Sequence, residues 1–205
     1  RGALMLTISI KHPDAERFID AKVDTSKVTG ANVSIKIDDD FMRAALAGKK
    51  YHQQFPIKSD NPKYEQDIDA RKLWEKIIHK SAEPGVLFWD TIIRESIPDC
   101  YADEGFVTVS TNPCGEIPLC PYESCRLLAM NLLSYVDNPF KADAKFNFDK
   151  FRDHVYKAMH MMDDIIDLEL EKVEQIIGKI AADPEDLDVR RVELELWKKI
   201  RTMAL

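Results

Sequence analysis

The sequence predicts an α/β fold on the basis of three observations. Short segments in which β-branched residues alternate with polar ones recur along the chain, segments of helical periodicity lie between them, and Pro, Gly, Asp and Asn separate the two kinds. Strands that alternate with helices indicate an α/β arrangement. With 205 residues, of which 45% are hydrophobic, the chain is long enough to bury a core. We therefore expect one domain, or most of one.

The first 48 residues read as strand, helix, loop, strand and helix. His12, interpreted as a turn residue, precedes Pro13 and Asp14, which end the first strand and cap the helix that follows. Asp38 to Asp40 cap the next helix and Gly48 ends it. The predicted elements are a strand at 4–10, a helix at 15–21, a loop at 22–31, a strand at 32–37 and a helix at 41–47.

The middle of the chain begins with a polar stretch, 49–66, that Pro56 and Pro62 interrupt, so we predict an irregular connection there. A helix is expected next because Leu73, Trp74 and Ile77 fall on one face. The predicted elements are that helix at 67–82 and two short strands at 86–89 and 106–110.

The last third is predicted to be mainly helical after an apolar segment at 127–135 and a turn at 137–139. The apolar stripe of the long helix that starts near Asp149 consists of Val155, Met159, Met162, Ile166, Leu170, Val173 and Ile177. Its acidic residues, Asp163, Asp164, Asp167 and Glu169, are interpreted as a solvated face. A second amphipathic segment, 185–205, places Leu187, Val192, Leu196, Ile200 and Met203 near one side.

Composition limits the function classes. The formal charge of −7 argues against a general nucleic-acid surface, which is normally basic. No apolar run approaches the roughly 20 residues of a membrane span, and the N-terminus carries no secretory signal pattern. We expect a cytoplasmic protein that binds neither membrane nor nucleic acid. The first residue is Arg1 and the last is reached within a helical pattern, so the chain is expected to be an internal piece, truncated at both ends.

Chemistry is indicated where all four cysteines lie within 26 consecutive residues, at Cys100, Cys114, Cys120 and Cys125. Around Cys114 the sequence is Asn112-Pro113-Cys114-Gly115-Glu116, in which Pro113 and Gly115 fit a tight turn. Such a turn brings an amide, a thiol and a carboxylate together on one short loop. An ordinary structural turn would need no more than the Pro and Gly.

The segment Thr111 to Leu119, Thr-Asn-Pro-Cys-Gly-Glu-Ile-Pro-Leu, is followed eleven residues after Cys114 by Cys125 in Tyr-Glu-Ser-Cys-Arg-Leu, and then by Asn131-Leu132. This pattern resembles the active-site segment of ribonucleotide reductase large subunits, closest to the adenosylcobalamin-dependent class II enzymes. The resemblance extends through 1–14 and 30–42 and covers nearly the whole chain. It implies that residues 1–205 are part of the family's ten-stranded α/β barrel, with subregions at 1–48, 67–135 and 149–205.

Carried over position by position, the resemblance implies that Cys114 becomes a thiyl radical and removes the 3′ hydrogen of the ribose. It implies that Glu116 takes the 3′-hydroxyl proton by general acid–base work, that Asn112 holds the ribose hydroxyls, and that Cys125 is one of two thiols that reduce the 2′ position. The implied cofactor is adenosylcobalamin, which generates the radical.

The resemblance also implies partners: a ribonucleotide substrate, a deoxynucleotide or ATP effector, a thioredoxin-like dithiol reductant and a second copy of the enzyme in a homodimer. The loop at 22–31 fits the family's loop between effector and substrate base, and a plain polar surface loop is the alternative. The residues assigned to the substrate and effector on this basis are Lys22, Lys27, Thr29, Gly30, Asn32 and Ser34.

One departure concerns the reducing pair. In the family the partner of Cys125 lies on a strand before the segment that opens this chain, and neither Cys100 nor Cys120 sits at its position. The phosphate-binding and cofactor-binding segments also lie outside 1–205. We therefore expect this polypeptide alone to be inactive.

Alternatives from other classes remain open. A cysteine hydrolase would need a histidine base, for which the candidates are His12, His52, His79, His154 and His160. A zinc site would use the four cysteines, although only Cys120 and Cys125 approach the usual spacing. The chain could also be a non-catalytic interaction module, or part of a class I reductase that takes its radical from a partner subunit.

Overall fold

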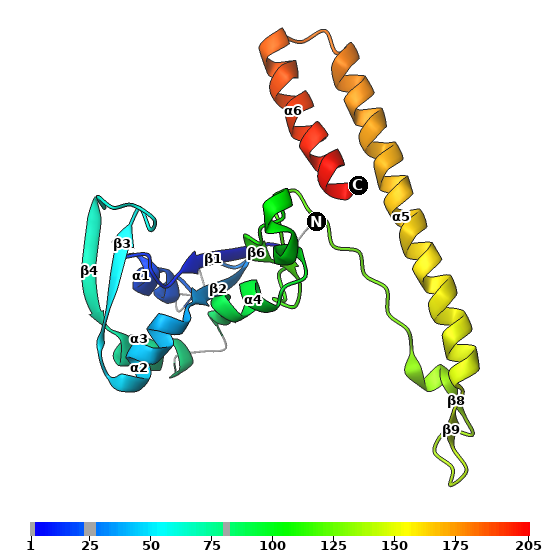
Figure 1. The fold of residues 1–205 in the computed structure, drawn as a ribbon, viewed down its shortest axis with the longest axis horizontal. Coiled ribbons are helices and arrows are strands. Elements are labelled where there is room, and N and C mark those ends of the chain that lie inside the picture. The colour runs from blue at the N-terminus through cyan, green and yellow to red at the C-terminus, as the bar shows by residue number, and fades with distance from the viewer. Residues whose placement is uncertain (1–2, 23–27, 80–82) are drawn as a thin grey trace. The chain divides into compact units, whose positions relative to one another are not determined.

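The computed structural model describes residues 3–22, 28–79 and 83–205, and the chain divides into two compact units, Arg1–Pro121 and Tyr122–Leu205 (Figure 1). Within these described ranges, no helix is both long enough and apolar enough to cross a membrane.

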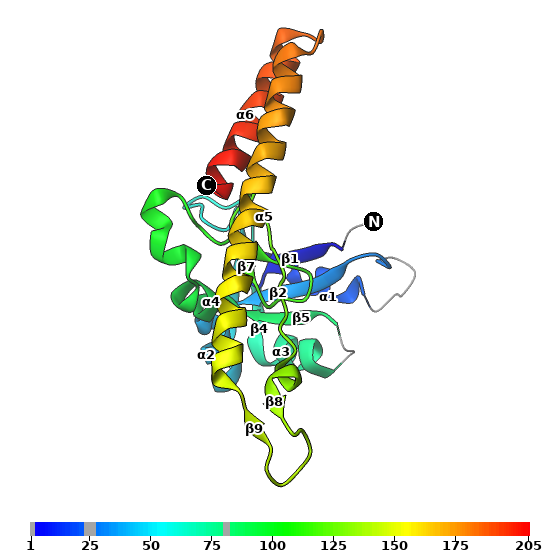
Figure 2. The same ribbon diagram turned by 90° about the vertical axis from the view of Figure 1, so that its right-hand side faces the viewer.

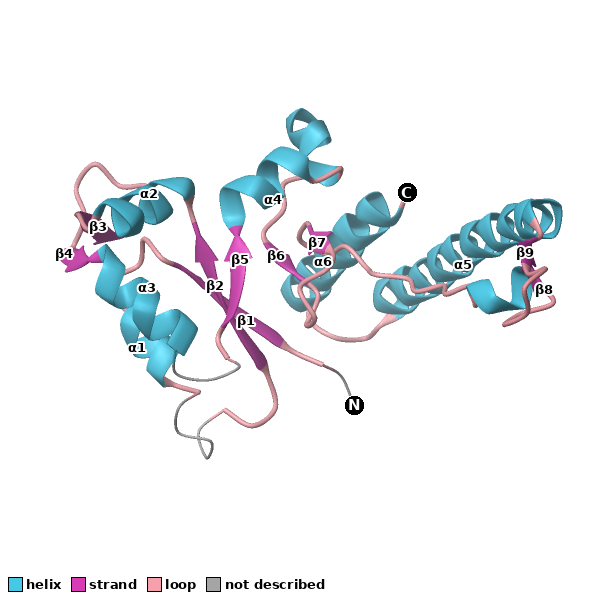
Figure 3. Cartoon of the chain, turned by 90° about the horizontal axis from the view of Figure 1, so that it is seen from below, coloured by secondary structure: helices cyan, strands magenta, loops and turns pink. Residues whose placement is uncertain are grey.

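A three-stranded parallel sheet forms the centre of the first unit (Figure 3). Its order is β1 (Met5–Ser9), β2 (Asn32–Ile37) and β5 (Gly85–Phe88). The predicted strands at 4–10, 32–37 and 86–89 are thereby confirmed, and β2 begins and ends where the alternation of Asn-Val-Ser-Ile-Lys-Ile predicts.

One face of this sheet is apolar and carries the core. Ile35 and Ile37 of β2 are buried there against helices α1 (Ala15–Asp20), α2 (Asp39–Ala47) and α3 (Ala70–His79), all of which Figure 3 shows beside the sheet. The core cluster comprises Ile10, Ala15, Ile19, Ile35, Ile37, Phe41, Ala45, Tyr51, Ala70, Leu73 and Ile77. This side-on packing of helices against parallel strands confirms the α/β class.

The start of α2 shows how the sequence sets an element boundary. Asp38 is its N-cap, and its Oδ1 accepts the N–H of Phe41 at 2.7 Å. The other carboxylate oxygen accepts from the buried Tyr51 hydroxyl at 2.6 Å. Gly48 ends the helix in the left-handed conformation, at φ 62°.

The prediction of an irregular connection at 49–66 is wrong. Strands β3 (Lys50–Phe55) and β4 (Tyr64–Asp69) form an antiparallel hairpin. Pro56 and Pro62 lie in its connection, so they interrupt neither strand. The hairpin is held to the end of β1 by the fully buried Gln53, whose Nε2 donates to the Ile10 carbonyl at 2.7 Å.

Two further boundaries differ from prediction. The helix expected at 67–82 begins at Ala70, because 67–69 belong to β4, and its last predicted residues, 80–82, lie outside the described part of the chain. The strand expected at 106–110 is limited to β6 (Ser110–Thr111), which pairs with β7 (Pro118–Leu119). Thr108 instead donates both its N–H and its hydroxyl to Asp99, in the turn η1 (Pro98–Glu104) that follows α4 (Trp89–Glu95).

The second unit is a helical hairpin preceded by a small two-stranded antiparallel pair. Helix α5 (Phe148–Ala182) lies antiparallel beside α6 (Leu187–Ala204) in Figures 1 and 2. The segment before α5 contains η2 (Leu132–Tyr135) and the short pair β8 (Val136–Asp137) and β9 (Lys145–Phe146). Both predicted helices are confirmed.

The prediction of which apolar residues form the contact face of α6 is largely wrong. Leu187 is 74% exposed and Val192 is 64% exposed, and Leu196 is exposed as well. The less exposed positions are Leu194, Trp197, Ile200 and Met203, so the contact face is rotated from the predicted one. Several apolar residues lie on both sides of this helix, and periodicity alone does not separate them.

Candidate active site around Cys114

The candidate catalytic residues lie on a tight loop between β6 and β7. Two hydrogen bonds join the ends of this loop. The Asn112 N–H donates to the Ile117 carbonyl at 3.0 Å, and the Ile117 N–H donates to Asn112 Oδ1 at 2.9 Å. Between them, the Gly115 N–H donates to the Asn112 carbonyl at 3.0 Å. Gly115 has φ 88°, a conformation that L side chains rarely adopt. The sequence-predicted turn is therefore present.

The loop presents its three functional groups differently. The side chains of Cys114 and Glu116 are exposed, and that of Asn112 is half-buried. Asn112 Oδ1 accepts from Ile117, and the Nδ2 donors of the same amide, which have no hydrogen-bond partner among the described residues, can be offered to a ligand. Asn112 thus both closes the loop and keeps donors available on the loop that carries the thiol.

The loop is docked on the second face of the parallel sheet, opposite the apolar core. In β2 this face carries Asn32, Ser34 and Lys36, which alternate with the buried Val33, Ile35 and Ile37. Asn32 Nδ2 donates to the Pro113 carbonyl at 2.5 Å, and Lys36 Nζ donates to the Val109 carbonyl. The hydroxyls of Thr7 in β1 and Ser110 lie 3.5 Å apart. These contacts connect two strands of the sheet to the segment that leads to Cys114.

Cys114 lines a cavity of about 290 Å³ between this loop and the sheet. From the sheet the lining includes Asn32 and Ser34, and the fifth strand contributes Gly85. Gly85 is required here because a Cβ at this position would lie 2.7 Å from the Ser34 hydroxyl oxygen. The structure therefore brings Cys114 together with Asn32 and Ser34, two residues that were predicted from a distant part of the chain.

Charged groups lie at two positions near this site. At the cavity, Glu83 is paired with Lys22 at 2.7 Å between Nζ and Oε2. On the sheet, burial lowers the pKa of Lys36, whose Nζ lies 4.0 Å from the centre of the Trp89 ring.

The predicted substrate and effector residues separate into three groups. Asn32 and Ser34 line the Cys114 cavity, and Lys22 reaches it through its ion pair with Glu83. Thr29 and Gly30 are exposed. Lys27 lies outside the described residues.

Cys125 belongs to the second unit, whereas Asn112, Cys114 and Glu116 belong to the first. Its neighbours are anchored to α5: the Ser124 hydroxyl lies 3.1 Å from Glu169 Oε1, and Arg126 forms an ion pair with the same carboxylate. The interpretation of Glu169 as part of a solvated face is therefore wrong. Helical periodicity could not reveal this residue, because its partners lie more than 40 residues earlier in the chain.

The remaining two cysteines differ in burial. Cys100 is exposed in η1, and Cys120 is buried directly after β7. Among the described residues, no group of three or more His, Cys, Asp or Glu side chains gathers as metal ligands would. The described residues that line the Cys114 cavity include no histidine either. The zinc and cysteine-hydrolase alternatives find no support in this geometry.

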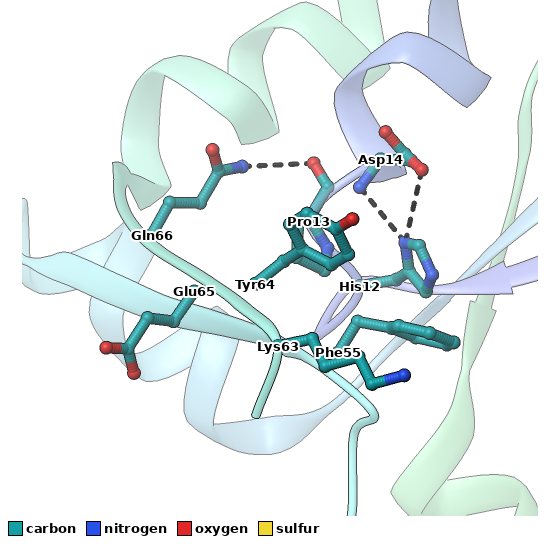
Figure 4. Close-up of a pocket in the computed structure, with 8 residues that line it drawn as sticks. All are labelled: His12, Pro13, Asp14, Phe55, Lys63, Tyr64, Glu65 and Gln66. Carbon is teal, nitrogen blue, oxygen red and sulfur yellow. Dashed lines mark hydrogen bonds and ion pairs between the residues drawn. The ribbon is translucent and has the colours of Figure 1, made fainter. Parts of the chain in front are cut away.

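A larger open pocket of about 860 Å³ lies between the turn after β1 and the β3–β4 hairpin (Figure 4). The His12 and Phe55 rings meet there with centroids 4.9 Å apart, and Gln66 donates to the Pro13 carbonyl at 3.0 Å. His12 Nδ1 accepts the Asp14 N–H at 3.0 Å, which confirms its interpretation as a turn residue. Apart from His12, a candidate base of the cysteine-hydrolase alternative, the described residues that line this pocket include no predicted site residue.

Comparison with known proteins shows which family this chain matches. The family model for the ribonucleotide reductase barrel domain matches residues 1–182. A vitamin B12-dependent ribonucleoside-diphosphate reductase of Thermoplasma acidophilum is 38% identical over 183 residues, which are 86% of this chain and 22% of the relative. The enzyme of the same name from Mycobacterium tuberculosis is 32% identical over 173 residues, 82% of this chain and 23% of the relative.

A vitamin B12-dependent ribonucleotide reductase of Streptomyces clavuligerus is 26% identical over 190 residues, which cover 80% of this chain and 19% of the relative. The chain therefore spans about a fifth of the length of these relatives. Its matched segment accounts for most of its own length, including the parallel sheet and the Cys114 loop. The chain belongs to the ribonucleotide reductase family and carries part of that family's barrel domain.

Proposed function

We propose that this chain carries the radical-bearing segment of an adenosylcobalamin-dependent ribonucleotide reductase. The observation that supports this most strongly is the Cys114 loop, in which an exposed thiol lines a cavity and the same loop carries the free amide donors of Asn112 and the exposed carboxylate of Glu116. The names of the Thermoplasma and Mycobacterium relatives support the same reaction and the same cofactor.

In the proposed reaction a ribonucleotide and two thiols give a 2′-deoxyribonucleotide, water and a disulfide. Cys114, as a thiyl, takes the 3′ hydrogen atom and returns it at the end. Glu116 accepts the 3′-hydroxyl proton, and the free Nδ2 donors of Asn112 hold the ribose hydroxyls. Cys125 and a second thiol from another part of the enzyme supply the two electrons.

The cofactor, when bound, supplies the radical that starts the reaction. The exposed thiol of Cys114 fits this role because a radical donor can approach it. The described residues offer no surface that we can assign to a corrin ring, so its binding is assigned to other segments of the enzyme. If Cys114 instead received its radical from a partner subunit, the chain would belong to a class I enzyme.

The finer features of the proposal follow the family. We propose a deoxynucleotide or ATP effector, a thioredoxin-like reductant, a homodimer and a cytoplasmic location. Lys22, Lys27, Thr29 and Gly30 remain candidates for the effector loop, and Asn32 and Ser34 for the substrate side of the same segment. DNA synthesis and repair are the processes that use the product.

The test is turnover by a complete reductase that carries this segment, supplied with a ribonucleotide, a dithiol and adenosylcobalamin. We expect Cys114→Ser to abolish deoxynucleotide formation, whereas Cys100→Ser, an exposed cysteine away from the loop, should retain it. Turnover by Cys114→Ser would refute the proposal. Turnover that needs a second protein and no cobalamin would support the class I alternative, and deoxynucleotide from residues 1–205 alone would refute the expected inactivity.

A further inference from the structure

Two side chains of β2, those of Asn32 and Lys36, hydrogen-bond to the backbone of the segment that carries Cys114. We propose that Asn32 and Lys36 are positioning residues that set the location of Cys114 relative to the sheet. The proposal rests on the proposed function only in naming Cys114 as the reacting residue. The contacts themselves are independent of which substrate is bound.

Asn32 acts at the peptide group next to the cysteine. Its Nδ2 donates to the Pro113 carbonyl, which belongs to the peptide bond between Pro113 and Cys114. A peptide group is planar, so a fixed carbonyl also fixes the direction of the following N–Cα bond. The Asn32 amide thereby restrains the backbone from which the Cys114 thiol projects.

Lys36 holds the same segment four residues earlier. Its Nζ donates to the Val109 carbonyl, just before β6. Asn32 and Lys36 are four residues apart on β2, as are Val109 and Pro113 on the segment that leads to Cys114, and both steps span about 13 Å when extended. The two segments therefore match in length, and the Thr7 and Ser110 hydroxyls meet between the two anchors.

A solvated lysine would not account for this geometry. Lys36 is half-buried, and its Nζ lies over the Trp89 ring. Removing an ammonium group from water is unfavourable unless partners replace the water. The Val109 carbonyl and the Trp89 ring are such partners. Lys36 and the segment that leads to Cys114 therefore hold each other in position.

Positioning of this kind affects the chemical step more than binding. Hydrogen abstraction requires close approach of the reacting atoms, and a displacement of about 1 Å can lower a rate about 100-fold. The substrate can still enter a cavity whose walls are otherwise intact. Loss of either anchor should therefore lower kcat, and loss of Lys36, which does not line the cavity, should leave KM nearly unchanged.

The test uses amide hydrogen exchange and steady-state kinetics on the complete reductase. The variants are Asn32→Ala, Asn32→Asp and Lys36→Met, and the controls are Asn61→Ala and Lys49→Met at positions without a side-chain contact to the loop. Asn32→Asp keeps the shape but replaces the donor with an acceptor. If Asn32→Ala fails to fold, Asn32→Asp still tests the effect of the lost hydrogen bond.

We expect exchange of the amides in 112–119 to accelerate about fivefold in each variant, the factor that corresponds to one lost hydrogen bond. We expect kcat to fall at least about tenfold in each variant, and KM to change less than about twofold in Lys36→Met. Wild-type exchange in Asn32→Asp or in Lys36→Met, or a change confined to KM in Lys36→Met, would overturn the proposal. If exchange accelerates but the wild-type enzyme reduces no nucleotide, the positioning role stands and the proposed function fails.

Discussion

Asp38 offers the sharpest test of how the end of β2 is stabilised. Its carboxylate is 6% exposed and serves two partners, the Phe41 N–H at the start of α2 and the Tyr51 hydroxyl. A third partner, Lys11, lies 3.5 Å away, but its side chain is 45% exposed. We predict that Asp38→Ala is strongly destabilising for the first unit.

The magnitude follows from the separate contacts. Loss of the cap costs about 1 kcal/mol, and a buried hydroxyl left without its acceptor costs about 1–3 kcal/mol. The Lys11 pair adds little, because one partner is solvated. We therefore expect Asp38→Ala to lower the free energy of unfolding by about 2–4 kcal/mol. Asp38→Asn retains an oxygen for the Phe41 N–H and should cost less.

Urea unfolding followed by tryptophan fluorescence provides the assay, in a Trp197→Phe background so that Trp74 and Trp89 of the first unit give the signal. Trp74 packs against the core. The matched control is Asp40→Ala, which removes an exposed carboxylate of the same helix that forms an ion pair with Arg43 at the surface. If the free energies of unfolding of Asp38→Ala and of the control differ by less than about 0.5 kcal/mol, the contacts of Asp38 with Phe41 and Tyr51 do not stabilise the first unit as we predict.

Three further predictions concern other contacts. Burial and the hydrogen bond to Asp38 raise the pKa of Tyr51, so its contribution is complete below about pH 10 and is lost as the pH rises further. Tyr51→Phe should therefore be destabilised by about 1 kcal/mol at pH 8, and urea unfolding should show the deficit shrinking toward pH 11; a constant deficit would contradict the assignment. Gly115→Ala should destabilise the Cys114 loop by about 1–2 kcal/mol through its backbone, since the new Cβ meets only Leu87 Cδ2 at 3.6 Å. Hydrogen exchange should then be faster in Gly115→Ala than in Gly115→Asn, and equal rates would argue against backbone strain. In a double-mutant cycle of Arg126→Ala and Glu169→Ala, urea unfolding should give a coupling of about 1 kcal/mol, and additive effects would remove the proposed anchor of the Cys125 segment.

The sequence predicted elements best where local pattern and tertiary environment agree. β2 alternates apolar and polar residues because one face meets the helices and the other meets the Cys114 loop. The β3–β4 hairpin was missed because its strands are rich in polar residues and its connection contains two prolines. Gln53 joins it to the end of β1, and the contact of that side chain with the Ile10 carbonyl spans 43 residues. No local periodicity indicates such a bond.

The candidate site likewise combines features that the local sequence predicts with contacts that it does not predict. The spacing of Asn112, Cys114 and Glu116 predicts a tight loop, since Gly115 supplies a conformation that few residues adopt. The sequence does not show that Asn112 Oδ1 closes this loop, nor that Asn32 holds it from 81 residues away. Those facts depend on where the sheet places the loop.

The two faces of β2 connect fold to function. Parallel strands in α/β proteins are usually apolar on both faces, because helices cover both. Here Asn32, Ser34 and Lys36 make one face polar, and a thiol-bearing loop covers it where a helix otherwise would. A polar ligand such as a ribose would need donors and acceptors in this cavity, which an apolar face could not provide. The alternation in β2 therefore distinguishes, in the sequence itself, the face that stabilises the sheet from the face that positions Cys114.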